Sequence, residues 1–213
     1  MGSISQIVKD ILKRDGLLQE AMNRNIVSYS KLASYIKPEI EKELGREIKP
    51  SAIVMAIRRL SEELEKHPIP RFHYSIETMR TGLSSIIVAC SPTLLEKLEK
   101  MYDMIDFRRG GVLNIVQGNH EIAIITNSKY KEKLIEIIGR ENVLEIIDDL
   151  ASISLAYPEN FLHVPGVVYD VTRFLAWENI NIVNIILTKT EFSLIVSEKD
   201  LMRCYSVLNR PTK

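Results

Sequence analysis

The pattern of apolar and polar positions divides the chain into a helical part and a part rich in strands. Over residues 4–66, apolar residues recur at helical spacing, for example at Ile53, Ile57, Leu60 and Leu64. After residue 70, strict alternation and short apolar runs take turns with helical spacing, which is typical of an α+β region. We therefore expect a helical domain, a linker or strand, and two α+β units, over residues 1–66, 67–82, 83–150 and 151–213.

The α+β region contains an internal repeat. Leu113–Val116 aligns with Val183–Ile186, and Glu121–Ile125 aligns with Glu191–Ile195, both with a shift of 70 positions. A constant shift over two strands and their turn indicates two copies of one supersecondary unit. In each copy, strands and helices alternate in the order that predicts a split βαβ unit, an antiparallel sheet with helices on one face.

The first strands of the two copies align with a different shift. Residues 85–89 align with 152–156 at a shift of 67, so the second copy has three extra residues before its hairpin. These residues fall in or beside the segment 158–166, and an insertion at one loop marks the place where one copy has been specialised.

The fourth strand is predicted for the first copy and unassigned for the second. Val143–Ile147 fits the fourth strand of the first copy, whereas the second copy ends at Lys213 with little room for one. Residues 71–79 alternate as a strand does, so they or a partner chain are candidates to supply it. The same segment also fits the wing of a winged helix.

The helical domain has the order of a helix-turn-helix unit. A short helix through Leu32 and Ile36 is expected to bend or restart at Lys37-Pro38, and a longer helix over 50–65 follows. As a recognition helix, this segment would contact DNA through Lys49, Ser51, Arg58 and Arg59. The alternative is a helical bundle that mediates protein contacts, with both arginines simply solvated.

Charge and composition narrow the function classes. The chain has 28 Lys and Arg against 28 Asp and Glu, and no region is a basic block, which counts against a strong non-specific nucleic-acid binder. Cys90 and Cys204 lie in apolar patterns typical of buried thiols, and no secretory signal is visible, so we expect a cytoplasmic protein. No apolar run approaches the roughly 20 residues of a membrane span.

The loop before the helix of the second copy is a candidate ligand site. The strand ending at Ala156 leads into 158–164, and the next helix opens at Pro165-Gly166-Val167. His163 and Val164 are poor helix caps, and glycine lets another group approach the backbone N–H groups closely. Such a helix start suits a carboxylate. The alternative is a helix begun by proline whose N–H groups meet water.

Three short motifs resemble the ACT domain, particularly the regulatory ACT pair of aspartate kinases: Val164-Pro165-Gly166-Val167-Val168, Phe174-Leu175 and Asn179-Ile180-Asn181-Ile182. Together with the helical domain, the chain resembles archaeal proteins predicted to regulate amino-acid metabolism. The resemblance implies βαββαβ units that pair through their sheets and bind an amino acid. The residues implied as ligand contacts are Asn160, Phe161, Leu162, His163, Val164, Pro165, Gly166, Val167, Asn181 and Ile182.

The sequence departs from the ACT pattern at two places. His163 stands where many ACT loops have the Asp or Asn that pairs with the ligand amine, which leaves Glu159 or Asn160 for that role. The first copy has Cys90-Ser91-Pro92-Thr93 in place of the Pro-Gly step. The resemblance therefore implies that the first copy is a structural partner rather than a second full site.

No arrangement for catalysis, metal binding or a cofactor is recognisable, so we expect no enzyme. Strict alternation over 182–188 would place Val183, Ile185 and Leu187 on one face and Ile182 and Ile186 on the other. Two apolar faces predict a homodimer or higher oligomer, unless the copies cover each other. The leading hypothesis is a DNA-binding transcriptional regulator that responds to an amino acid. The alternatives are a regulatory subunit that controls a biosynthetic enzyme through protein contacts, and an adaptor that binds neither.

Overall fold

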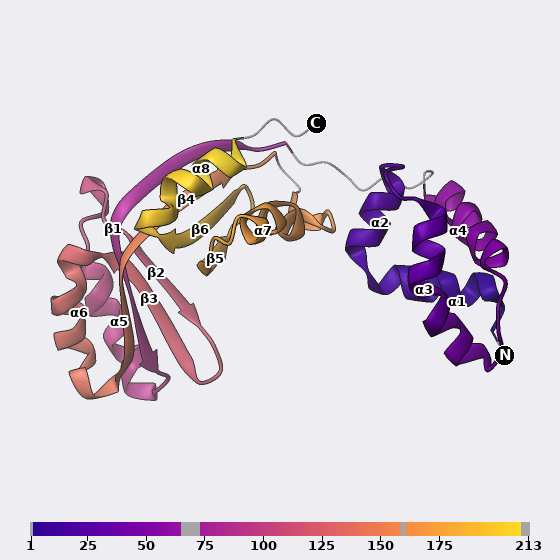
Figure 1. Ribbon diagram of the computed structural model, residues 1–213. Helices are drawn as coiled ribbons and strands as arrows, with labels where there is room; N and C mark the ends of the chain where they lie inside the picture. Colours follow the sequence, from indigo (N-terminus) through magenta and orange to yellow (C-terminus); the bar gives the residue numbers. More distant parts are fainter. Residues whose placement is uncertain (1, 65–72, 159–160, 210–213) are drawn as a thin grey trace. The chain divides into compact units, whose positions relative to one another are not determined.

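The computed structural model describes residues 2–64, 73–158 and 161–209, and the chain forms two compact units, Met1–Arg71 and Phe72–Lys213. The first unit is helical, with α1 (Ile4–Arg14), α2 (Gly16–Asn23), α3 (Tyr29–Leu44) and α4 (Pro50–Leu64) (Figure 1). Ser3 and Asp15 cap the first two helices through their side-chain oxygens. The apolar faces meet in a core that includes Leu12, Met22, Ile40, Ile53 and Ile57.

One of the two outcomes expected at Lys37-Pro38 is wrong: the helix does not restart there. It continues through Pro38 to Leu44, where Gly45 ends it in the left-handed conformation. Proline inside a helix removes one backbone hydrogen bond, that to the carbonyl group of Ser34. The helix persists because residues on both sides of the proline, Ile36 and Ile40, are buried in the core.

The second unit contains one six-stranded antiparallel sheet in the order β2-β3-β1-β4-β6-β5. Its elements are β1 (Ser75–Ala89), α5 (Pro92–Met104), β2 (Leu113–Gln117), β3 (Glu121–Asn127), α6 (Lys131–Ile138), β4 (Val143–Ala156), α7 (Val167–Trp177), β5 (Ile182–Leu187), β6 (Glu191–Ser197) and α8 (Leu201–Leu208). Both hairpins predicted from the repeat are present.

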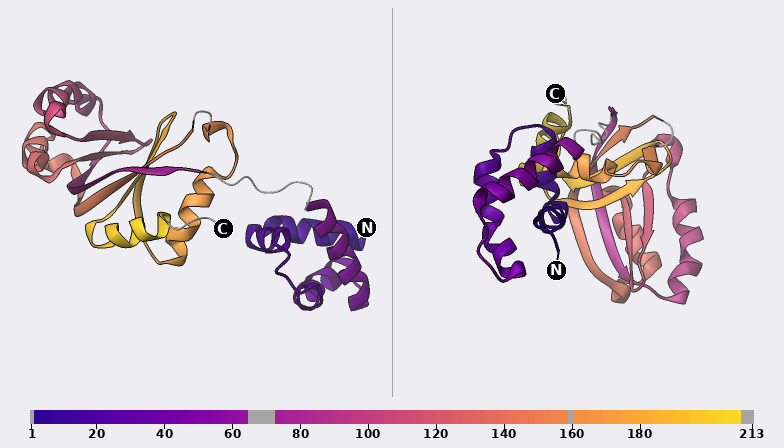
Figure 2. Two further views of the ribbon diagram at one scale, coloured as in Figure 1. Left: turned by 90° about the horizontal axis from the view of Figure 1, so that it is seen from above. Right: turned by 90° about the vertical axis from the view of Figure 1, so that its right-hand side faces the viewer.

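Two long strands, β1 and β4, run through both copies of the repeat (Figures 1 and 2). Residues 83–89 of β1 pair with β3 in copy one, whereas residues 75–80 pair with the second half of β4 in copy two. The missing fourth strand of copy two is therefore the beginning of β1, and Val143–Ile147 is the fourth strand of copy one, as predicted. The boundary expected after residue 82 lies inside β1, and the boundary expected after residue 150 lies inside β4.

Both long strands are irregular where they pass between the copies. Gly82 and Asp149, which are equivalent at the shift of 67, have positive φ angles of 67° and 54°. Pairing between β1 and β4 shifts register between Arg80 and Leu83 and again between Leu83 and Ser85. Bulges of this kind bend a strand and increase its twist. The sheet consequently curves from one copy to the other.

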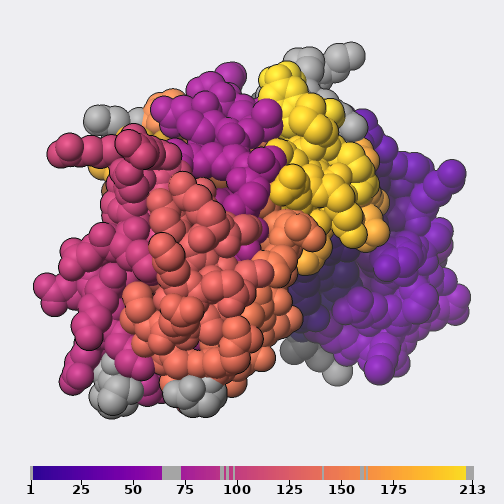
Figure 3. Space-filling view, turned by 90° about the vertical axis from the view of Figure 1, so that its left-hand side faces the viewer, coloured from indigo at the N-terminus to yellow at the C-terminus, as the bar shows by residue number. Residues whose placement is uncertain are grey.

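All helices of this unit pack on one face of the sheet, and the opposite face carries a small cluster where the copies meet. Leu83 and Ile125 of copy one are buried there against their equivalents in copy two, Leu150 and Ile195. In the space-filling view, α6 occupies the middle of one side, with the start of β1 and α8 above it (Figure 3). The copies thus cover part of each other's open face within one chain.

The faces expected for β5 need one correction. Its pairing with β6 shifts between Ile182 and Asn184, so strict alternation is lost at Val183. Ile182 and Ile185 therefore both pack toward the helices, and Val183 and Ile186 toward the open-face cluster. The bulge changes which side chains share a face, a shift that alternation alone does not reveal.

Candidate functional site

The connection between β4 and α7 forms the candidate site. Ten residues, 157–166, separate the two elements, and a single turn at Phe161–His163 lies within them. Gly166 is the N-cap residue of α7 with a φ of 97°, and among the described residues no side chain forms a capping hydrogen bond to this helix. The first N–H groups of a helix have no intrahelical acceptor, so this helix start offers donors to an external acceptor.

A cavity of about 310 Å³ lies beside this helix start. Phe161, Val164, Gly166 and Val167 of the predicted loop line it, together with three residues that were not among the predicted ligand contacts: Val168, Tyr169 and Leu187. Apart from the backbone and the tyrosine, the described part of the lining is apolar. Leu187 enters because the end of β5 lies at the same end of the sheet as the β4–α7 loop, which follows from the βαββ connectivity.

Other predicted ligand contacts do not line this cavity. His163 and Pro165 are exposed, Asn160 lies outside the described residues, and so does the Glu159 offered as an alternative amine partner. Asn181 and Ile182 follow the C-terminal end of α7, whereas the cavity adjoins its N-terminal end. Within one copy, the structure therefore does not bring Asn181 and Ile182 to the loop.

Three aromatic rings pack against one another next to the cavity, and one of them, Phe161, also lines it. The ring of Tyr157 lies 4.6 Å from that of Phe161 and 5.3 Å from that of Tyr74. Burial raises the pKa of Tyr157 above its ordinary value, and the hydroxyl group has no hydrogen-bond partner among the described residues. Burial, more than the nearby charge of Asp170, also raises the pKa of Tyr74, to about 12. Both rings remain neutral at physiological pH and act as apolar packing.

The predicted DNA-contact residues lie on one exposed side of the helical unit. Lys49 and Ser51 are exposed at the start of α4, and Arg58 and Arg59 two turns further along. Arg58 is paired with Glu62 at 3.5 Å, and Met55 is half exposed between the two groups. The surface is therefore mixed in character rather than a basic stripe.

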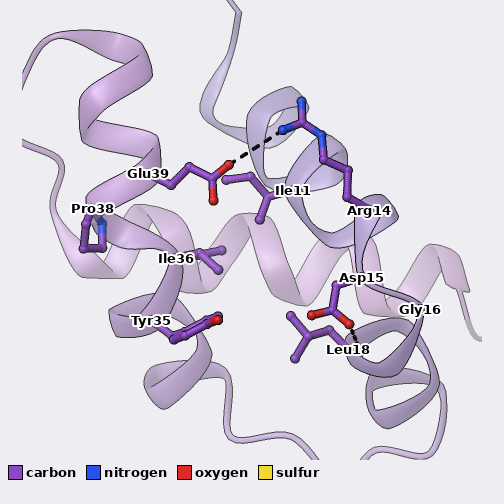
Figure 4. A pocket seen from close by; sticks show the side chains of 9 residues that line it. All are labelled: Ile11, Arg14, Asp15, Gly16, Leu18, Tyr35, Ile36, Pro38 and Glu39. Carbon is purple, nitrogen blue, oxygen red and sulfur yellow. Dashed lines mark hydrogen bonds and ion pairs between the residues drawn. The ribbon is translucent and has the colours of Figure 1, made fainter.

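The helical unit has a cavity of its own, of about 530 Å³, between α1, the start of α2 and α3 (Figure 4). Leu18 and Tyr35 lie on either side of it, and Arg14 and Glu39 form an ion pair at 3.7 Å. None of the predicted DNA-contact residues lines this cavity.

Within residues 2–64, 73–158 and 161–209, no group of three or more His, Cys, Asp or Glu side chains gathers as a metal site. In the same part of the chain, no helix has the length and apolar character needed to cross a bilayer.

Comparison with known proteins identifies the fold. No family model matches the chain, and no curated protein sequence is similar to it. The α and β subunits of an aspartokinase share the fold with a TM-score of 0.50 and 19% identity, over 63% of this chain and 96% of theirs. The ligand-free regulatory subunit of aspartate kinase from Thermus thermophilus gives a TM-score of 0.52 and 14% identity, over 65% of this chain and 99% of that one.

A third structure, the regulatory subunit of aspartate kinase from Thermus flavus, gives a TM-score of 0.51 and 13% identity, over 63% of this chain and 96% of that one. At such identities the likeness establishes a shared fold. The α+β fold predicted from the repeat is thus confirmed as that of aspartate kinase regulatory subunits, the ACT type. The helix-turn-helix assignment of residues 1–66 stays a prediction.

Proposed function

We propose that this protein is a non-catalytic, amino-acid-responsive regulator that binds its ligand in the cavity beside Gly166. The observation that carries the proposal is the coincidence of a cavity of amino-acid size with a helix start that no side chain caps among the described residues. The carboxylate of the ligand accepts hydrogen bonds from the N–H groups at the start of α7, where the helix dipole also favours negative charge. The shared fold with regulatory subunits of aspartate kinase supports this role.

The lining of the cavity selects the class of amino acid. Phe161, Val164, Val167, Val168 and Leu187 provide an apolar wall, and none of the lining residues that the structure describes is charged. A charged or strongly polar ligand side chain would lose its hydration there without a partner. The ligand is therefore an amino acid with a branched or aromatic apolar side chain, held in a cavity near the lower end of the ~300–1,000 Å³ range of ligand pockets.

The regulatory output passes through protein contacts. The helical unit exposes large apolar side chains at Leu17, Ile26, Tyr35 and Met55, and one of its exposed arginines, Arg58, is paired with Glu62. Apolar side chains on a mixed surface suit a protein partner, whereas DNA binding requires unpaired cations along the phosphate backbone. The partner is an enzyme or a second regulatory chain, which corresponds to the regulatory-subunit form of the hypothesis.

Thermal-shift measurements with the twenty amino acids test the ligand site. An apolar amino acid at a hundred times its Kd should stabilise the protein by about 2.7 kcal/mol. Val168→Trp fills the cavity from an exposed position and should abolish that shift, whereas Ala176→Trp, two turns further along the exposed side of α7, should preserve it. The proposal fails if no apolar amino acid stabilises the protein, or if the response survives Val168→Trp.

A gel-shift measurement at low salt separates the two outputs. We expect the wild-type protein to show no affinity for the DNA upstream of its own gene. If it does bind, and Arg58→Ala with Arg59→Ala removes that binding while leaving the fold intact, the DNA-binding form of the hypothesis takes precedence. Light scattering at micromolar concentration tests the expected homodimer in the same sample.

A further inference from the structure

A second cavity, of about 280 Å³, lies on the open face of the sheet where the two copies meet. The sheet of copy two forms its floor, and the α5–β2 segment of copy one forms its opposite wall, with Phe107, Gly111 and Asn114 among the lining residues. It shares no lining residue with the cavity beside Gly166. A ligand here would contact both copies at once.

The floor of this cavity is a row of hydroxyl groups. Thr78, Ser154 and Ser193 are cross-strand neighbours on β1, β4 and β6, and Ser152 lies in the next row. The three serines are 5–8% exposed although the helices described for this unit all pack on the other face of the sheet. Buried hydroxyl groups beside open space hold hydrogen-bonding capacity that a polar molecule can use.

These hydroxyls orient a carboxylate. Ser193 Oγ donates to Glu191 Oε1 at 2.5 Å, and Ser154 Oγ lies 2.6 Å from Ser193 Oγ. Because the Ser193 proton goes to Glu191, Ser154 must donate to Ser193. The oxygen of Ser154 therefore keeps lone pairs for a further donor, and Glu191 is held in one position at the edge of the cavity.

A cation and an anion line the same cavity without pairing. The Arg80 guanidinium approaches the carbonyl oxygen of Gly110 at 3.5 Å, the outer limit of a hydrogen bond, and Glu191 takes its hydrogen bond from Ser193. In the described part of the chain, neither side chain forms an ion pair. Opposite charges held apart across a cavity are complementary to a molecule that carries both signs.

The wall from copy one depends on two glycines. Gly110 ends the turn at Phe107–Arg109 with a φ of 77°, and a Cβ atom on Gly111 would lie 2.6 Å from Ile105 Cγ2 and 2.7 Å from the backbone oxygen of Asp106. Only glycine therefore allows this segment to fold back as closely as it does. The segment 105–112 is twice as long as its counterpart in copy two, 178–181.

Two serines of the floor, Ser154 and Ser193, belong to copy two alone, whereas Ser152 has a serine equivalent in copy one, Ser85. At the repeat shifts, Ser154 corresponds to Ile87 and Ser193 to Ala123, so copy one has apolar residues at both positions. A sheet face that only needed to pack against its neighbour would have kept the apolar pattern, since buried hydroxyls are costly without partners. Ser154 and Ser193 are therefore a feature of the cavity rather than of the scaffold.

We propose that this cavity binds a small polar zwitterion, with the size and chemistry of a hydrophilic α-amino acid. Arg80 binds the carboxylate, Glu191 binds the ammonium group, and Ser154 with Ser152 contacts the polar side chain. The ligand joins the two copies because Arg80 and the hydroxyl row belong to copy two and the facing wall to copy one. This site is additional to the apolar-ligand site beside Gly166.

Calorimetric titration of the full chain with serine, threonine, asparagine and glutamine tests the proposal. At least one should bind, and its Kd should rise about tenfold or more in Arg80→Gln and in Glu191→Gln, as expected for a lost charge-assisted hydrogen bond. Arg108→Gln, an exposed arginine on the same segment but outside the lining, and Glu145→Gln, on the open face of copy one, are matched controls that should leave Kd unchanged.

Chemical analogues of the bound amino acid assign each charge to its partner. The carboxamide, which lacks the carboxylate, should bind the wild-type protein weakly, and Arg80→Gln should not weaken its binding further. The N-acetyl derivative, which lacks the ammonium group, should likewise bind weakly, and Glu191→Gln should not weaken its binding further. Val168→Trp should leave this binding intact. The proposal is overturned if none of the four amino acids binds at millimolar concentration, if binding survives both charge variants, or if Val168→Trp abolishes it.

Discussion

The two copies of the repeat share one scaffold but connect it differently. Two residues, 90–91, join the first strand to the helix in copy one, against ten residues, 157–166, in copy two. After the helix, copy one has the longer connection: eight residues, 105–112, against four residues, 178–181, in copy two. The net difference of three residues visible in the sequence thus combines opposite changes. In copy two the loop before the helix is longer by eight residues, the helix is shorter by two, the loop after it is shorter by four, and the next strand begins one position earlier. Each lengthened connection lines a cavity, one beside Gly166 and one on the open face.

The scaffold itself is nearly the same in both copies. The central residues of the two hairpins, Ile124 and Leu194, are equivalent at the shift of 70 and are fully buried in their respective cores. A rigid layer of sheet and helices can therefore be duplicated while its loops change separately. Binding residues commonly lie in such loops.

The largest expected effect comes from the shared core. Ile124→Ala and Leu194→Ala should each lower the free energy of unfolding by about 2–5 kcal/mol, because each leaves a cavity in a fully buried cluster. Since β1 and β4 belong to both copies, either variant should increase hydrogen exchange in both hairpins, 113–127 and 182–197. Ile57→Ala in the helical unit is the control and should leave exchange in the sheet unchanged. Exchange that rises in the altered copy alone would show that the copies unfold independently.

The next effect distinguishes the two helix starts. Gly166→Ala should cost about 1–2 kcal/mol, because an L-residue is strained at a φ of 97°. The same strain would accompany Gly166→Val, so that variant is unsuited to testing ligand binding. Ser91→Ala should cost about 1 kcal/mol, since its hydroxyl group accepts a hydrogen bond from the N–H of Leu94 at 3.2 Å.

Urea denaturation measures both helix-start variants, with Gly16→Ala as the control. Gly16 has no positive φ and open space around it, so alanine there should be neutral or stabilising. If Gly166→Ala were as well tolerated as Gly16→Ala, the left-handed start of α7 would not be a requirement of the loop.

The smallest effect concerns an ion pair that only copy one has. Lys131 Nζ lies 2.8 Å from Asp148, whereas the residue equivalent to Lys131 in copy two is the buried Leu201. Hydrogen bonds from Lys131 and then from Ser84 hold the pKa of Asp148 below its usual 3.8. The pair is partly exposed, so Asp148→Asn should cost less than about 1 kcal/mol at neutral pH.

The pH dependence of this difference follows from the sign of the shift. A carboxyl group with a lowered pKa stabilises the fold above its unfolded pKa, and that contribution disappears as the pH falls through the folded value. The stabilities of wild type and Asp148→Asn should therefore converge below pH 3.8. Asp149→Asn is the control and should be nearly neutral throughout, because asparagine tolerates the positive φ at that position.

The sequence predicted those parts of the fold that depend on local pattern. The hairpins of both copies were found because their strands and turns have equal lengths, so that one shift aligns them. For the fourth strand of copy two the sequence left two candidates, residues 71–79 and a partner chain, because the pairing partner on β4 lies far along the chain and no local signal joins them. The structure supports the first candidate. The continuity of α3 through Pro38 and the bulge at Val183 likewise depend on tertiary packing, which overrides local preference.

The sequence likewise indicated the loop of the candidate site but not all the residues that line its cavity. Proline and glycine beside poor caps indicated the loop at Gly166, since these residues act on the backbone directly. Leu187 was missed because its place at the cavity follows from the connectivity of the sheet rather than from any motif. The polar cavity was missed as well, although serine at alternate positions 152 and 154 is a visible signal of a polar sheet face.

The course of β1 has a consequence for synthesis on the ribosome. Residues 75–81 emerge about 75 residues before their partners in β4, so at 5–20 residues per second this strand waits roughly 4–15 s without a neighbour. An unpaired strand is a hazard for aggregation, and charged or polar side chains reduce it. Glu77, Thr78, Arg80 and Thr81 occupy this stretch and remain exposed at the sheet edge in the finished fold. The segment that closes the last copy is thus composed to stay soluble while the nascent chain grows.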